Sequence, residues 1–174
     1  MELLDIVDEK GNPTGETVPR EVAHREGIRH RTAHVWIFRR RGGVVQILLQ
    51  KRSDNKDSDP GCYDISSAGH IPAGSDYIPS AVRELKEELG VDMNGDELIY
   101  CGQRLFRFER EFHGSMFCDN QVSNVYALWL DREEEAFVLS DDFRRRILLS
   151  SHAVGIVPPH AAVSVFYCNR FFRR

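Results

Sequence analysis

The alternation of apolar and polar positions predicts a chain built mainly from short strands. Residues 2–7 alternate as one strand, and the turn-forming residues at 8–13 would reverse the chain into a hairpin. Two apolar and β-branched runs, 31–38 and 44–50, flank a glycine-containing turn at 39–43, which is typical of a second hairpin. We expect later strands at 105–108 and 122–130, and the chain could re-enter the sheet at 63–67.

Two segments have helical signals. Pro19 opens a segment of about two turns that ends at Gly27. The segment 78–89 is the stronger helix, and it ends at Gly90. Its apolar stripe consists of Ile78, Ala81, Val82, Leu85 and Leu89. Several strands, one strong helix and polar loops, including a surface loop at 53–61, together predict an α+β domain with a mixed β-sheet.

Composition restricts the class of protein. A chain of 174 residues with 41% hydrophobic residues can form one compact domain, and it is neither disordered nor collagen-like. No apolar run approaches the ~20 residues that span a bilayer, and the N-terminus is acidic where a secretory signal would be basic. We therefore expect a cytoplasmic protein without a membrane partner. Its four scattered cysteines are expected to be reduced.

The charge is unevenly distributed along the chain. Residues 1–142 contain 17 Lys and Arg and all 27 Asp and Glu, whereas residues 143–174 contain six Arg and no acidic residue. An acidic body of this kind is a poor partner for nucleic acid, because binding to nucleic acid depends on phosphate neutralisation by Lys and Arg. A small anionic ligand is different, because a bound cation can supply the positive charge locally.

The polar face of the helix at 78–89 carries the candidate chemistry. This face contains Arg83, Glu84, Glu87 and Glu88. Glu84 and Glu88 are four residues apart, and such a like-charge pair costs an isolated helix a few tenths of a kcal/mol. One interpretation is that these charged residues simply form the solvent-exposed face of the helix. Three carboxylates on one face are also the oxygen ligands that Mg²⁺ selects.

Residues 69–91 resemble the Nudix box. The box has Gly, five residues of any type, Glu, seven residues of any type, and then Arg-Glu-apolar-x-Glu-Glu-x-Gly-apolar. The matching positions are Gly69, Arg83, Glu84, Leu85, Glu87, Glu88, Gly90 and Val91. Ser75 stands where the first Glu of the box belongs, and we expect the neighbouring Asp76 to replace it.

The resemblance implies a Nudix-like α/β/α sandwich with a mixed central sheet, and an enzyme that hydrolyses a diphosphate linked to another moiety. It implies Mg²⁺, with Mn²⁺ as the alternative, on Glu84, Glu87 and Glu88. It assigns catalytic roles to Arg83, Glu84 and Glu87, with Arg83 orienting the carboxylates; whether Glu84 is a ligand or the base stays open. The substrate would be a small nucleotide-type or isoprenoid-type diphosphate. The resemblance is also compatible with a homodimer.

Segments outside the box resemble the branch related to isopentenyl diphosphate isomerase. They comprise 30–37, 48–53, 60–61 and 66–71. Ala68 stands where the isomerase has its catalytic cysteine, and residues 120–126 lack the carboxylate of a later isomerase strand, so a hydrolase is favoured. An isomerase-like enzyme and a catalytically silent Nudix-fold binding module are the alternatives.

Other side chains near these segments are candidates for ligand contacts. His30 and His70 match metal-ligand positions of the isomerase and His24 lies within a residue of a third, but a structural, hydrogen-bonded histidine is the favoured interpretation of each. The candidates for substrate phosphate are Arg52, Lys56 and His70.

The C-terminal segment departs from the family pattern. We therefore predict a Nudix domain at 1–142 and an atypical basic segment at 143–174, for which a short helix over 147–151 is expected if it belongs to the fold. The segment could be a lineage-specific tail or could bind an acidic partner or membrane surface. Our hypothesis is an altered reading frame near residue 142, because acidic residues and the family pattern are lost at the same point.

Overall fold

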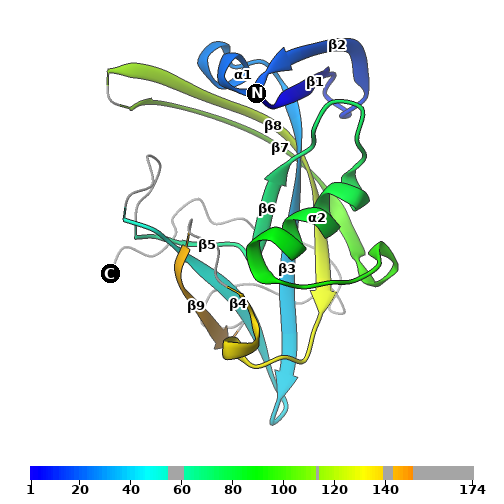
Figure 1. Cartoon of the computed structure of the whole chain (residues 1–174), viewed down its shortest axis with the longest axis vertical. Helices are drawn as coiled ribbons and strands as arrows, with labels where there is room; N and C mark the ends of the chain where they lie inside the picture. The colour runs from blue at the N-terminus through cyan, green and yellow to red at the C-terminus, as the bar shows by residue number, and fades with distance from the viewer. Residues whose placement is uncertain (55–60, 113, 139–142, 151–174) are drawn as a thin grey trace.

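The computed structural model describes residues 1–54, 61–112, 114–138 and 143–150 (Figure 1). The chain begins with an antiparallel hairpin of β1 (Leu3–Val7) and β2 (Pro13–Pro19), followed by α1 (Arg20–Glu26). Gly27 ends α1 in the left-handed conformation, at φ 66°, as the sequence predicts. This N-terminal unit buries its own small apolar cluster, formed by Leu4, Val18 and Ala23.

The main sheet is mixed. Its strands are β3 (His30–Arg41), β4 (Val44–Arg52), β5 (Tyr63–Asp64), β6 (Ser67–His70), β7 (Ile99–Phe112), β8 (Ser115–Trp129) and β9 (Phe143–Ser150). β3 pairs in parallel with β8, whereas the other pairs in this sheet are antiparallel. Short 3-10 turns lie at Gly95–Glu97 and Glu134–Ala136. The predicted mixed α+β architecture is confirmed.

The strong predicted helix is α2 (Tyr77–Leu89). The carboxylate of Asp76 accepts a hydrogen bond from Tyr77 N at its start, and Gly90 ends it in the left-handed conformation at φ 64°. Ala81, Leu85 and Leu89 are buried against the sheet. Ile78 was assigned to this apolar stripe wrongly, because it lies in the first turn and is 43% exposed.

The two faces of β3 differ in character. Ala33, Val35 and Ile37 join the apolar cluster that contains the α2 residues. Side chains alternate between the faces of a strand, so the even-numbered residues form the opposite face. That face is apolar at Trp36 and Phe38, but at its start it buries three polar side chains, those of His30, Thr32 and His34. Buried polar residues at one end of a strand mark the region where a functional site belongs.

Several strands extend beyond their predicted limits. β7 and β8 form a long hairpin, part of which projects from the body of the molecule (Figure 1). The prediction of 105–108 covered only the middle of β7, because glycine and polar residues precede it at 102–104 and charged residues follow it at 109–111. The conditional helix at 147–151 was also wrong, since β9 pairs antiparallel with β4. Within the described part of the chain, no helix is long and apolar enough to cross a membrane.

Candidate functional site

Gly69 on β6 allows α2 to approach the sheet closely. A Cβ atom at this position would lie 2.1 Å from Cδ of Glu84, so only glycine leaves room for that carboxylate against the strand backbone. Arg83 Nη2 donates to Glu84 Oε1 at 2.5 Å and to the His70 carbonyl oxygen at 3.2 Å. Arg83 therefore holds the carboxylate that the resemblance predicts it to orient.

The three box glutamates occupy different environments. Glu88 lies one turn after Glu84, and its Oε2 accepts long hydrogen bonds from Gln50 Nε2, at 3.3 Å, and from Ala68 N, at 3.4 Å. Burial raises the pKa of Glu88 to about 7, and burial likewise raises that of Glu84 to about 7 against the opposing effect of Arg83. Glu87 is exposed. Two of the predicted ligands thus face the sheet and one faces solvent.

The loop before α2 is held by a residue that the sequence did not suggest. The Asp5 carboxylate on β1 accepts hydrogen bonds from Gly74 N, at 3.0 Å, and from Arg31 Nη2, at 2.7 Å. Arg31 Nη2 also donates to the carbonyl oxygen of Ser75 at 2.8 Å. Since the side chain of Asp76 caps the helix, Asp5 together with Arg31 supports this loop where Ser75 replaces the box glutamate.

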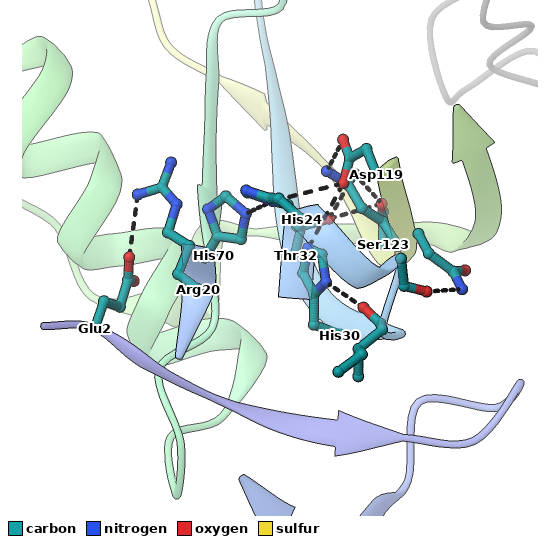
Figure 2. A network of polar contacts seen from close by, with 12 residues as sticks. Glu2, Arg20, His24, His30, Thr32, His70, Asp119 and Ser123 are labelled. Atoms are coloured by element: carbon teal, nitrogen blue, oxygen red, sulfur yellow. Dashed lines mark hydrogen bonds and ion pairs between the residues drawn. The ribbon is translucent and has the colours of Figure 1, made fainter. Parts of the chain in front are cut away.

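A second cluster of metal-ligand types lies on the other side of β6 (Figure 2). It combines His24 from α1, His30 from β3 and His70 from β6, and one nitrogen of each ring lies within 4.8 Å of the others. His24 Nε2 and His70 Nε2 are 3.2 Å apart. Hydrogen bonds of His24, His30 and His70 agree with the structural role favoured for each, but their rings also contact one another. Whether the three bind a metal stays a prediction.

The hydrogen bonds of His30 fix its tautomer. His30 Nδ1 lies 2.9 Å from the Ile28 carbonyl oxygen, which can only accept, so Nδ1 carries the proton and Nε2 carries a lone pair. That Nε2 atom is buried and has no hydrogen-bond partner among the described residues. A metal-ligating histidine typically donates its second nitrogen to a carbonyl in this way.

Asp119 on β8 completes the cluster. Its Oδ1 atom is also buried without a hydrogen-bond partner in the described part of the chain, and it lies 3.6 Å from His30 Nε2 and 3.8 Å from His24 Nε2. Burial lowers the pKa of His24 to about 4 and also lowers those of His30 and His70, which favours the neutral imidazoles, whereas burial raises the pKa of Asp119. Three neutral imidazoles and a carboxylate are a donor set that fits a divalent transition metal such as Zn²⁺ or Mn²⁺.

An indirect signal for Asp119 is present in the sequence. Asp119 lies just before the segment 120–126, which lacks the carboxylate of the comparable isomerase strand. Asp119, Gln121 and Ser123 alternate as polar residues along β8, and Gln121 pairs with His30. The parallel pairing of β3 with β8 places Asp119 beside the histidines, and that pairing was not predicted.

Two of the three residues predicted to contact substrate phosphate lie in the described part of the chain. Arg52 Nη1 forms an ion pair with Asp64 at 2.9 Å, so its charge is already partnered on the sheet. His70 belongs to the histidine cluster. Lys56 lies outside the described residues.

Comparison with known proteins identifies the family. The model of the NUDIX domain matches residues 28–164. The chain belongs to the Nudix family. The match continues past residue 142, where we predicted that the domain ends. That boundary and the branch related to the isomerase stay predictions.

Two curated relatives show the extent of the similarity. Nudix hydrolase 3 of Arabidopsis thaliana is 45% identical over 72% of this chain, which spans 16% of that protein. An uncharacterised Nudix hydrolase of Clostridium acetobutylicum is 39% identical over 81% of this chain and 66% of its own length. The chain thus corresponds to about a sixth of the first relative and about two thirds of the second.

Solved structures confirm the Nudix fold. A Deinococcus radiodurans crystal structure has a TM-score of 0.61 at 21% identity, with 88% of this chain and 86% of that chain covered. The NUDIX domain of Shewanella oneidensis NrtR, solved with ADP ribose, has a TM-score of 0.53 at 13% identity, with 71% and 74% covered. At these identities the likeness concerns the fold alone.

Proposed function

We propose that this Nudix protein is a Mg²⁺-dependent hydrolase that cleaves a diphosphate linked to another moiety. The observation that carries the proposal is the seating of Glu84 against Gly69, with Arg83 bound to its carboxylate and Glu88 one turn away. These contacts join the box residues into one unit on β6 and α2. A helix face that is merely solvated would not need a glycine at the contact point.

The cation would be held by Glu84, Glu87 and Glu88, with Mn²⁺ as the alternative to Mg²⁺. Glu88 fits this role, because its carboxylate is largely buried and its hydrogen bonds from Gln50 and Ala68 are long. When bound, a divalent cation neutralises the charge that develops on the phosphate oxygens.

The chain's own residues would prepare the attack by water. Burial raises the pKa values of Glu84 and Glu88 to about 7 in the absence of a cation, and a bound cation would favour their charged forms. Arg83 keeps Glu84 in place through its hydrogen bond and is itself fixed by the His70 carbonyl. The catalytic residues in this proposal are Arg83, Glu84 and Glu87.

The histidine cluster supports a second cation site of different chemistry. His30 Nε2 and Asp119 Oδ1 are buried polar atoms that lack hydrogen-bond partners among the described residues, and a metal ion would satisfy both. Because its donors are mainly nitrogen, this site would prefer a transition metal over Mg²⁺.

The test is a phosphate-release assay with Mg²⁺ on nucleotide sugars, ADP-ribose, dinucleotides and isoprenoid diphosphates. Hydrolysis of the first three gives phosphate monoesters, so added alkaline phosphatase converts these products to inorganic phosphate for detection. ADP-ribose belongs in the panel because the Shewanella domain was solved with it. We expect turnover by the wild type and a loss of about 100-fold or more in Glu87→Gln and Glu88→Gln. Glu97→Gln, at an exposed glutamate away from the box, is the matched control and should retain activity.

Two outcomes would contradict the hydrolase. A wild type that binds these diphosphates without releasing phosphate would be a binding module. A wild type that rearranges an isoprenoid diphosphate without hydrolysis would be isomerase-like. Metal analysis of the purified protein tests the second site separately, since His24→Gln should remove a retained transition metal that Glu88→Gln keeps.

A further inference from the structure

β7 lies at one edge of the main sheet. Among the described residues it pairs only with β8, along its length from Ile99 to Phe112. No described strand covers the backbone N–H and C=O groups on its other side. The outer part of this hairpin also projects from the body of the molecule (Figure 1). A strand edge of this kind can pair with a strand from another chain.

The features that protect an edge strand from pairing are confined to the base of β7. The register with β8 shifts between Tyr100 and Gly102, and a bulge of this kind disrupts pairing locally. Beyond the bulge, the register is regular from Gly102 to Phe112. β7 also contains neither proline nor lysine, which often block an edge. The outer part of β7 is therefore a regular edge that can accept another strand.

Opposite charges stand beside each other on the exposed face of this outer part. Arg107 and Glu109 are two residues apart, so their side chains lie on the same face of β7. Arg107 Nη2 is 2.6 Å from Glu109 Oε1, and the two side chains are 64% and 49% exposed. An exposed pair contributes about 0–1 kcal/mol to the fold, so both groups remain open to partners on a neighbouring strand.

A second copy of β7 can pair antiparallel with the first about a two-fold axis normal to the sheet. Such an axis keeps each face of the sheet on its own side, so it must pass beside a residue that pairs with its own copy. With Phe108 at the axis, Arg107 lies opposite the partner's Glu109, and the symmetry repeats this ion pair. On the other face, Phe106 lies opposite the partner's Arg110. Arg110 already makes a cation–π contact of this type with Phe108.

The neighbouring registers are less favourable. An axis at Arg107 or Arg110 opposes arginine to arginine, and an axis at Glu109 opposes that glutamate to its own copy. Like charges directly opposite each other are destabilising. An axis at Leu105 or Phe106 forms no ion pair. The charges on this edge therefore select one register, the one with two ion pairs and no like charges opposed.

Antiparallel pairing also keeps the two bodies apart. The two hairpins run in opposite directions, so the body attached to each lies beyond the tip of the other. The contact would join the two sheets into one continuous sheet.

We propose that this protein forms a homodimer through antiparallel pairing of two β7 strands, with Phe108 at the two-fold axis. The dimer does not depend on the hydrolase function. Because the contact is confined to one pair of strands, its dissociation constant is expected to be about 10 µM.

Charge reversal tests the contact. The mass of the full-length protein is followed by analytical ultracentrifugation from about 1 to 100 µM. We expect Arg107→Glu and Glu109→Arg each to weaken the dimer about tenfold or more, because both place like charges opposite each other at two symmetric positions. The double variant restores opposite charges and should return the dissociation constant to within about threefold of the wild type. Glu16→Arg, at an exposed position on β2, is the matched control and should dimerise like the wild type.

A cysteine at the axis tests the register. Opposed Cα atoms in an antiparallel pair are about 4.5–5.5 Å apart, within the range that a disulfide spans. Oxidised Phe108→Cys should therefore run as a covalent dimer on a non-reducing gel. Phe106→Cys is the matched control, since its two copies would be about 13 Å apart along the strand. The wild type shows the background from the four natural cysteines.

Four outcomes would overturn the proposal. The wild type could remain monomeric over the whole range, the single charge variants could dimerise like the wild type, the double variant could fail to restore the dimer, or Phe106→Cys could cross-link as well as Phe108→Cys. Circular dichroism confirms that the variants fold. If a cysteine variant does not fold, the charge variants still decide, because their side chains are exposed.

Discussion

At the scale of single residues, the absence of one methyl group at Gly69 decides where the Glu84 carboxylate lies. Gly69 has an ordinary backbone conformation, so its role is to provide space rather than to adopt a positive φ. Gly90 differs, since it ends α2 at φ 64° and a Cβ there would lie 2.6 Å from Val138 Cγ2. The two motif glycines are thus required for separate reasons.

Gly69→Ala tests this spatial role. The added Cβ would collide with Glu84, so the carboxylate must move away from Arg83 and β6. A displacement of about 1 Å at a catalytic group can cost about 100-fold, and we expect a loss of that size in kcat/KM with the fold retained. Phosphate release on the best substrate of the panel measures it. Gly42→Ala is strained by its φ of 54° but has nothing within 4 Å of the added Cβ, so it should lower stability and keep its activity. An equally active Gly69→Ala would show that Glu84 has no such constraint.

The sequence was sufficient to locate the box residues but not their environments. Spacing placed Arg83, Glu84 and Glu88 on one helix face, and the structure keeps them there. Spacing could not show that Glu84 and Glu88 turn toward the sheet, because this depends on Gly69 and Gln50 from other strands. Asp119 was missed for the same reason, since its neighbours come from strand pairing.

At the scale of elements, β1 supports the loop that leads into α2. The Arg31–Asp5 ion pair is nearly buried, with side chains 7% and 12% exposed, and it links β3, β1 and the loop at Gly74 and Ser75. We had expected Asp76 to substitute for the missing box glutamate. Its role is instead to cap α2.

Asp5→Ala should destabilise the fold strongly, because it leaves the Arg31 charge buried without its partner. Removing one member of a buried ion pair costs about 3–5 kcal/mol in the free energy of unfolding. Glu2→Ala provides the contrast, since the Glu2–Arg20 pair is exposed, and such pairs contribute about 0–1 kcal/mol. Urea unfolding measures both variants. Similar midpoints for the two would mean that Asp5 does not hold the loop.

The elements differ in how well the sequence predicted them. α2 was predicted well because its apolar stripe indicates a helix and Gly90 marks where that helix ends. The hairpin of β7 and β8 was underestimated because Gly102 and the charged residues at 109–111 interrupt the apolar pattern of β7.

At the scale of the whole molecule, β9 joins the region beyond residue 142 to the main sheet. It pairs with β4 from Gln46 to Arg52. Leu148 packs against the main apolar cluster, and its backbone N–H donates to Glu134 Oε1 at 2.5 Å. The change in composition at 142 therefore does not coincide with the end of the described sheet.

Two truncated chains test the predicted domain boundary. A chain that ends at residue 142 would leave the edge of β4 unpaired and remove Leu148 from the core, whereas a chain that ends at residue 150 keeps both contacts. The shorter chain loses both the pairing of β9 and the packing of the partly buried Leu148, so we expect it to be less stable by about 2 kcal/mol in urea unfolding. Its unpaired strand edge should also make it aggregate more readily. Equal stability of the two chains would instead support a domain that is complete at residue 142.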